Sequence, residues 1–161
     1  MKKSFTLIET LVAISILGIG ILGISFLISS QISSIHYSEN KLIAAYLAQE
    51  AIEILRNIRD TNWLNNRDWD AGITLNATTT KLDYTTTSSI PDSNFLDSSC
   101  DRLKFDGNFY NCSLGRETPF KREIFISKSG DEMTIKITIS WQEKGRIHHY
   151  FLTGKLYNWR K

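Results

Sequence analysis

Proline is scarce in this 161-residue chain: there are two, and neither lies between Met1 and Ile90. A helix in the first part of the chain would therefore run without a proline kink. Charge is missing from one stretch, because the 29 residues from Thr10 to Ser38 contain no Asp, Glu, Lys or Arg. About 20 apolar residues in a helix cross the ~30 Å hydrocarbon layer of a bilayer. This stretch therefore predicts a membrane-spanning helix.

Motifs of catalysis are also missing. The chain has no G-x-S-x-G or H-E-x-x-H sequence, and its two cysteines leave no further thiol as a nucleophile. His148 and His149 are neighbours on a predicted strand, so they point to opposite faces and cannot bind one metal together. A G-x-G-x-x-G pattern at Gly18, Gly20 and Gly23 lies inside the apolar helix, where it cannot bind a dinucleotide. We expect no enzyme activity, no cofactor and no metal.

The charges around the apolar run predict its orientation. Lys2 and Lys3 precede it and no basic cluster follows it, which places the N-terminus in the cytoplasm. We therefore expect a single-pass protein of the cytoplasmic (inner) membrane with an extracytoplasmic C-terminal domain. A cleaved secretory signal peptide is disfavoured, because the run is longer than a signal-peptide core and has no A-x-A site. A plain signal anchor is the simplest alternative.

One carboxylate does not suit a plain anchor. Glu9 lies at the start of the apolar run, between Ile8 and Thr10. A carboxylate costs about 2.5–3.5 kcal/mol at the bilayer centre and less near its edge, and an anchor gains nothing from it. Glu9 therefore indicates a partner that compensates its charge.

The stretch SFTLIETLVAISIL, from Ser4 to Leu17, resembles the N-terminal signature of type IV prepilins and type II secretion pseudopilins. The resemblance implies that prepilin peptidase cleaves between Ser4 and Phe5 and that Phe5 becomes the N-methylated terminus. It also implies that Glu9 neutralises the terminal amine of a neighbouring subunit, a pairing that costs less than burying either charge alone. The sequence departs from the family at Ser4, where Gly is usual, and at Phe26, where many pilins have proline.

Helical periodicity continues beyond the apolar run. The apolar residues of one helix face recur every three or four positions: Ile43, Leu47, Ala51, Ile54, Leu55 and Ile58. We expect the helix to extend from Phe5 to about Asp60, where capping residues begin. The segment Tyr46 to Trp63 also resembles the second half of this helix in minor pilin-like proteins.

Strand periodicity marks the C-terminal part. Apolar and polar residues alternate over 133–142, which predicts an antiparallel strand with one dry face. Further strands are expected near Lys121–Lys128 and Arg146–Leu156, joined by hairpin turns at 129–131 and 144–145. The dry face should pack on the helix at Leu47, Ala51, Ile54 and Ile58.

The expected fold class is α+β and pilin-like, a long N-terminal helix packed on a small antiparallel sheet. We expect a leader peptide at 1–4, a transmembrane or filament-core helix at 5–35 and its amphipathic continuation at 36–60. Residues 61–161 would form an extracytoplasmic β-rich head, although 61–99 carry little pattern.

The two cysteines, Cys100 and Cys112, bracket Asp106-Gly107, a hairpin-type turn. The orientation places both outside the cytoplasm, where disulfides persist. A zinc site would need two further ligands, which are missing nearby. We therefore predict a disulfide between them.

Taken together, these features predict a structural subunit, a minor pilin of a type IV pilus-like filament, held in the membrane before assembly and on the cell surface afterwards. Expected partners are other pilin subunits, prepilin peptidase, the assembly platform and the lipid bilayer. The alternatives are a type II secretion or competence pseudopilin, and a non-polymerising membrane-anchored extracytoplasmic binding module. A competence role would make DNA a partner, and a basic stripe would be drawn from Arg116, Lys121, Arg122 and Lys128.

Overall fold

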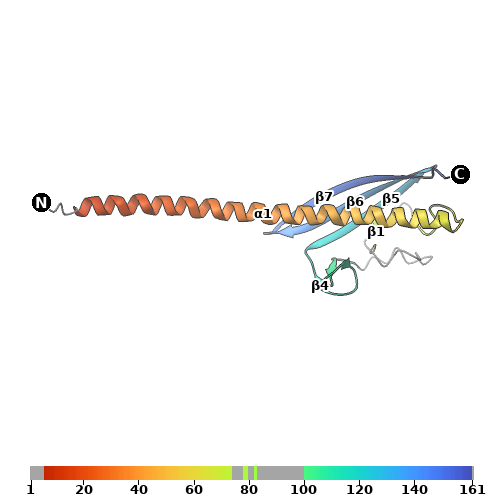
Figure 1. Ribbon diagram of the computed structural model, residues 1–161, viewed down its shortest axis with the longest axis horizontal. Coiled ribbons are helices and arrows are strands. Elements are labelled where there is room, and N and C mark those ends of the chain that lie inside the picture. The colour runs from red at the N-terminus through yellow and green to blue at the C-terminus, as the bar shows by residue number, and fades with distance from the viewer. Residues whose placement is uncertain (1–5, 74–77, 80–81, 83–99, 161) are drawn as a thin grey trace. The chain divides into compact units, whose positions relative to one another are not determined.

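The computed structural model describes residues 6–73, 78–79, 82 and 100–160. They fall into two compact units, residues 1–39 and 40–161, each of which is described by itself. One helix, α1, spans the 58 residues Leu7–Leu64 and contributes to both units (Figure 1). The strands all belong to the second unit. A long N-terminal helix with antiparallel sheets confirms the predicted α+β class and is consistent with a pilin-like fold.

The end of α1 lies four residues beyond the predicted Asp60. Asn66 adopts a left-handed conformation (φ 52°), which a helix seldom continues through. The amide of Arg67 donates to the carbonyl of Asn62 (2.9 Å), and the amide of Asn66 donates to that of Trp63 (3.2 Å). These two bonds are the Schellman pattern, which satisfies the last carbonyls of the helix. The stop signal is therefore Asn66 and not the polar residues after Arg59.

The larger sheet has the strand order β1-β5-β6-β7, and all its pairs are antiparallel. Its strands are β1 (Thr78–Thr79), β5 (Phe120–Ser129), β6 (Glu132–Glu143) and β7 (Arg146–Tyr157). The three long strands confirm those predicted near 121–128, over 133–142 and at 146–156. The register sets Ile124, Ile137 and Leu152 side by side across them.

A smaller sheet was not predicted from the sequence. It has the order β3-β2-β4, with strands of two residues each: β2 (Lys104–Phe105), β3 (Tyr110–Asn111) and β4 (Arg116–Glu117). Strands this short carry no measurable alternation, so their sequence resembles that of a loop.

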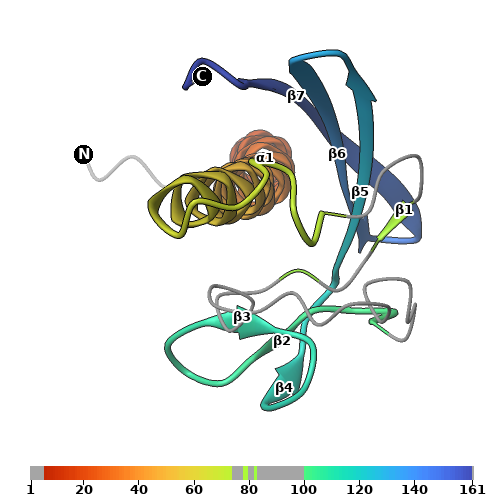
Figure 2. The same cartoon turned by 90° about the vertical axis from the view of Figure 1, so that its right-hand side faces the viewer.

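The core of the second unit includes one face of α1 and the inner face of the larger sheet. Figure 2 shows α1 lying along that side of the sheet. The predicted contact residues Leu47, Ala51, Ile54 and Ile58 are all buried, as are the inward-facing residues of β5 and β6. Near the end of β7 the helix and the strand approach closely. A Cβ placed on Gly154 would lie 2.7 Å from Cδ1 of Ile52, so the absence of a side chain permits the contact.

Candidate functional site

The first turn of α1 holds the predicted assembly residue, Glu9. The amide of Glu9 donates to Oγ1 of Thr6 (3.3 Å), and Thr6 immediately precedes the helix. Thr-x-x-Glu is the capping-box pattern, in which a Thr side chain satisfies an unpaired amide at the helix start. The main-chain amide of Glu9 therefore takes part in a helix cap that the sequence interpretation missed, although the Thr-x-x-Glu pattern could have been recognised. Ser4 and Phe5, the predicted cleavage and methylation residues, lie outside the described residues.

The helix of the first unit presents apolar side chains on every side. No residue from Thr6 to Glu39 is buried within the chain. The helix is long and apolar enough to cross a membrane by its length and composition. Burial of apolar surface stabilises by about 25 cal/mol per Å². Side chains such as Leu11, Leu22 and Phe26 therefore require an apolar environment that this chain does not itself provide.

The serines of the same helix satisfy their hydroxyls internally. Oγ of Ser15 donates to the carbonyl of Leu11 (2.8 Å), and Oγ of Ser25 donates to that of Ile21 (2.9 Å). Ser29 repeats the pattern with the carbonyl of Ser25 (3.0 Å). A polar group surrounded by lipid or packed helices must find its partner within protein. The polar residues of this helix are therefore compatible with an apolar environment.

A disulfide joins Cys100 to Cys112, as predicted, with Cα atoms 5.4 Å apart. The loop that it closes contains β2 and β3. Oδ1 of Asp106 accepts hydrogen bonds from the amides of Asn108 and Phe109 (both 2.8 Å), and these bonds lower the pKa of Asp106. The disulfide and the turn therefore order a segment that has little apolar core of its own.

Loss of the disulfide should lower the stability of the second unit. We expect the Cys100→Ser/Cys112→Ser variant to lose about 3 kcal/mol of unfolding free energy, because its unfolded chain is no longer constrained by the loop closure. Urea unfolding of the full chain in detergent micelles, followed by tryptophan fluorescence, measures the change. A reductant should destabilise the parent chain but leave the double variant unchanged. Equal stability of the parent and the double variant would contradict a stabilising role.

The four candidates for a basic stripe, which a DNA-binding role would need, do not form one. Such a stripe would require Arg122 at the surface, but its side chain is fully buried, because the alternation of β5 places it on the inner face beside Ile124. Arg122 is therefore excluded from it. Its Nη1 lies 3.1 Å from Oε2 of Glu50 and donates to the carbonyl of Leu47 (3.2 Å). Glu50 on α1 is therefore the partner of a buried charge.

The other three basic candidates do not converge. The ammonium of Lys121 lies 3.3 Å from the carboxylate of Glu123. Lys128 pairs with Asp70 and lies over the ring of Trp69, 5.2 Å from its centroid. Arg116 is exposed on the smaller sheet. Two of the three cations are thus already engaged with carboxylates, and the described residues give no support to a nucleic-acid interface.

The two adjacent histidines point to opposite faces of β7, as predicted. His148 is half-buried and stacks on Trp141 (centroids 5.4 Å apart), whereas His149 is exposed and stacks on Phe151 (5.9 Å). Each imidazole therefore packs against an aromatic ring. Both histidines occupy ordinary positions on a strand.

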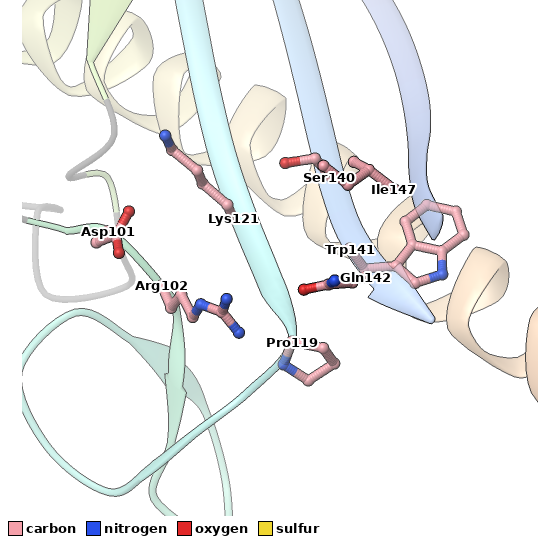
Figure 3. A pocket seen from close by; sticks show the side chains of 8 residues that line it. All are labelled: Asp101, Arg102, Pro119, Lys121, Ser140, Trp141, Gln142 and Ile147. Atoms are coloured by element: carbon pink, nitrogen blue, oxygen red, sulfur yellow. The ribbon is translucent and has the colours of Figure 1, made fainter. Parts of the chain in front are cut away.

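The second unit includes depressions of about 150 and about 300 Å³, the larger lined by residues of α1, the smaller sheet and the start of β5. One of about 150 Å³ lies beside β5 and β6 and is lined by both acidic and basic side chains (Figure 3). Its lining residues are Asp101, Arg102, Pro119, Lys121, Ser140, Trp141, Gln142 and Ile147. Ligand sites are commonly about 300–1,000 Å³ in volume. This depression is too small for such a site.

Comparison with known proteins supports the interpretation of the N-terminus. Residues 1–25 match the family model described as the prokaryotic N-terminal methylation motif, which is the type IV prepilin signature. No curated protein and no solved structure gives a match. The predicted resemblance is thereby confirmed for this segment. The signature supports a type IV pilin or pseudopilin-like protein, and with the apolar helix it fits a membrane-anchored one.

Proposed function

We propose that the chain is a minor pilin, a structural subunit of a type IV pilus-like filament. The observation that carries the proposal is the combination of the methylation motif with a helix that is apolar on all sides. Such a helix has two suitable environments, a bilayer and a bundle of similar helices. Transfer from one to the other avoids exposing its apolar surface to water.

The proposed pathway begins in the cytoplasmic membrane, with the N-terminus inside and the second unit outside. Prepilin peptidase would cleave between Ser4 and Phe5, and Phe5 would be N-methylated. On assembly Glu9 would pair with the terminal ammonium of a neighbouring subunit. The partners are then prepilin peptidase, the assembly platform, lipid and other pilin subunits. Once assembled, the subunit would lie in a filament on the cell surface.

The first test is the mature N-terminus. We expect mass spectrometry of the chain from its native membrane to find an N-terminal peptide that begins with methylated Phe5. Because the family usually has Gly before the cut, the Ser4→Gly variant should raise the processed fraction. Deletion of the peptidase gene is the control and should leave Met1 in place. An intact Met1 in cells with active peptidase would favour the plain membrane anchor and overturn the proposal.

A type II secretion or competence pseudopilin would carry the same signature and the same helix. Tyr46–Trp63 resembles the corresponding segment of minor pilin-like proteins and Ser4 departs from the usual cleavage site, and both features favour a minor over a major pilin. The choice between a pilus subunit and a pseudopilin needs an experiment. Immunogold labelling of sheared surface filaments separates the two: a pilus subunit labels long filaments, whereas a pseudopilin remains with the cell envelope.

A further inference from the structure

A short piece of α1 separates the apolar run from the second unit. The helix begins at Leu7, and Ile35 is the last aliphatic residue of the run. At about 1.5 Å per residue these two are about 42 Å apart, which matches the ~40–45 Å of a bilayer with both head-group layers. Asn40, the first residue of the second unit, follows Ile35 by about 8 Å of helix. When the helix spans a bilayer, the start of the second unit therefore lies close to the outer head groups.

The turn between β6 and β7 lies at the same end of the second unit. Nδ2 of Asn40 donates to Oε2 of Glu143 (3.3 Å), the last residue of β6. Glu143 pairs with Arg146, the first residue of β7, across the turn formed by Lys144 and Gly145. Because β6 has twelve residues, the turn that joins it to β5 lies about 37 Å away at its other end. Residues 40–42 and 143–147 are called the proximal end below.

The proximal end carries more positive than negative charge. Lys41, Lys144 and Arg146 are all exposed. The single carboxylate among these residues is that of Glu143, which accepts the hydrogen bond from Asn40. The cations are therefore available to an anionic surface, whereas the carboxylate is held within the unit.

The surroundings of the proximal end add little net charge. Glu39, the last residue of the first unit, contributes one carboxylate. Other nearby charges come in pairs of opposite sign at the two depressions: Arg116 with Glu117, Arg102 with Asp101, and Lys121 with Glu123. An excess of positive charge therefore remains at this end of the unit.

Two exposed aliphatic side chains lie among the cations. Leu42 is 55% exposed and follows Lys41 on α1, and Ile147 is 66% exposed and follows Arg146 on β7. Lys and Arg are attracted to an anionic lipid surface, and aliphatic side chains beside them enter the boundary between head groups and acyl chains. The membrane that α1 spans brings such a surface within reach of the proximal end. Because the helix itself brings it there, lipid is the partner that this geometry selects.

We propose that the proximal end of the second unit docks on anionic phospholipid head groups of the membrane that α1 spans. Lys41, Lys144 and Arg146 contact the phosphates, and Leu42 and Ile147 enter the head-group layer. The inference rests on the membrane-stored state of the proposed function and adds to it a lipid contact made outside the spanning helix. Departure of the subunit from the bilayer breaks this contact.

Reconstitution of the full chain in nanodiscs tests the contact. A lipid with a paramagnetic head group speeds the relaxation of nearby amides, and Gly145 and Gly130 report from the turns at opposite ends of β6. In discs of equal parts phosphatidylglycerol and phosphatidylcholine, we expect the enhancement at Gly145 to be at least about fivefold that in phosphatidylcholine alone. Gly130 should differ little between the two kinds of disc. High salt should remove the difference at Gly145, because it screens exposed charges.

Matched double variants locate the contact. Lys144→Asn/Arg146→Gln removes two cations of the proximal end, and Asn tolerates the positive φ of residue 144. The ratio of docked to undocked chains should fall about thirtyfold, which returns Gly145 in anionic discs to its value in phosphatidylcholine. Arg67→Gln/Lys136→Gln removes two exposed cations elsewhere, after the end of α1 and on the outer face of β6, and should leave the enhancement unchanged.

Three results would overturn the proposal: equal enhancement at Gly145 in the two kinds of disc, equal enhancement at Gly145 and Gly130, or equal effects of the two double variants. Enhancement that appears only with two copies of the chain per disc would also overturn it, and would assign the proximal end to a protein contact. Each of these outcomes leaves the proposed function standing. An intact Met1 would overturn that function whether or not the second unit docks on lipid.

Discussion

We expect the Glu9→Gln variant to be lost from the proposed filaments while it remains inserted in the membrane. Gln serves the N3 position of a capping box as Glu does, so the helix start with Thr6 is preserved and only the charge is lost. An unpaired ammonium buried between subunits costs about 3 kcal/mol or more, so incorporation should fall at least about a hundredfold. Immunoblots of sheared filaments and of membranes measure the two pools.

Two further variants separate charge from helix capping. Glu53→Gln removes a carboxylate from the exposed face of α1, where it pairs only with Arg56, and should assemble normally. Thr6→Ala removes the capping hydroxyl but keeps the charge of Glu9, and should retain incorporation. If Glu9→Gln assembles as well as Glu53→Gln, the charge pairing does not occur and the proposal of a polymer loses its main physical support.

Glu50→Ala should destabilise the second unit by about 3 kcal/mol, because it leaves the guanidinium of Arg122 without its carboxylate. The side chain of Arg122 is 0% exposed and that of Glu50 is 30% exposed. Water can therefore compensate for part of the loss, which places the effect at the low end for a broken buried pair. Urea unfolding of the full chain in micelles, monitored by tryptophan fluorescence, gives the difference.

The control for this prediction is again on α1. Glu53→Ala breaks the exposed pair with Arg56 and should stay within about 0.5 kcal/mol of the parent. The double variant Glu50→Leu/Arg122→Met replaces the buried pair by apolar groups and should recover to within about 1 kcal/mol of the parent. Equal losses for the two alanine variants would mean that the Arg122 pair is not a buried contact in solution.

The parts of the fold that sequence predicted are those with long periodic patterns. Alternation over ten or more residues identified β6, and the three-to-four spacing identified the buried face of α1 around Leu47 and Ile54. The end of α1 was missed because its signal is the conformation of a single residue, Asn66. The small sheet was missed because its order comes from a disulfide and from side-chain hydrogen bonds to the main chain, as at Asp106.

Sequence analysis placed some residues of the candidate site correctly and others incorrectly, for a similar reason. Glu9 was found because a carboxylate in an apolar run is conspicuous, whereas its capping contact required the local pattern Thr-x-x-Glu to be considered as well. Arg122 was misplaced because a single basic residue on a strand looks exposed until the partner strand and the helix are known. Its neighbours Lys121 and Glu123 do face outward, so the alternation alone could have assigned it to the interior.

Gly154 bears on how β7 aligns with β6 when the hairpin forms. The two-residue turn at Lys144-Gly145 fixes the alignment of β7 with β6 from one end of the hairpin. At the other end the tip of the Ile52 side chain lies against Gly154, where a Cβ would be 2.7 Å from Cδ1 of Ile52. A slip of two residues would keep every face correct but bring Leu152 or Leu156 beneath Ile52. The Ile52 side chain would then have to move, so this contact acts together with the turn in favouring the observed alignment of the hairpin.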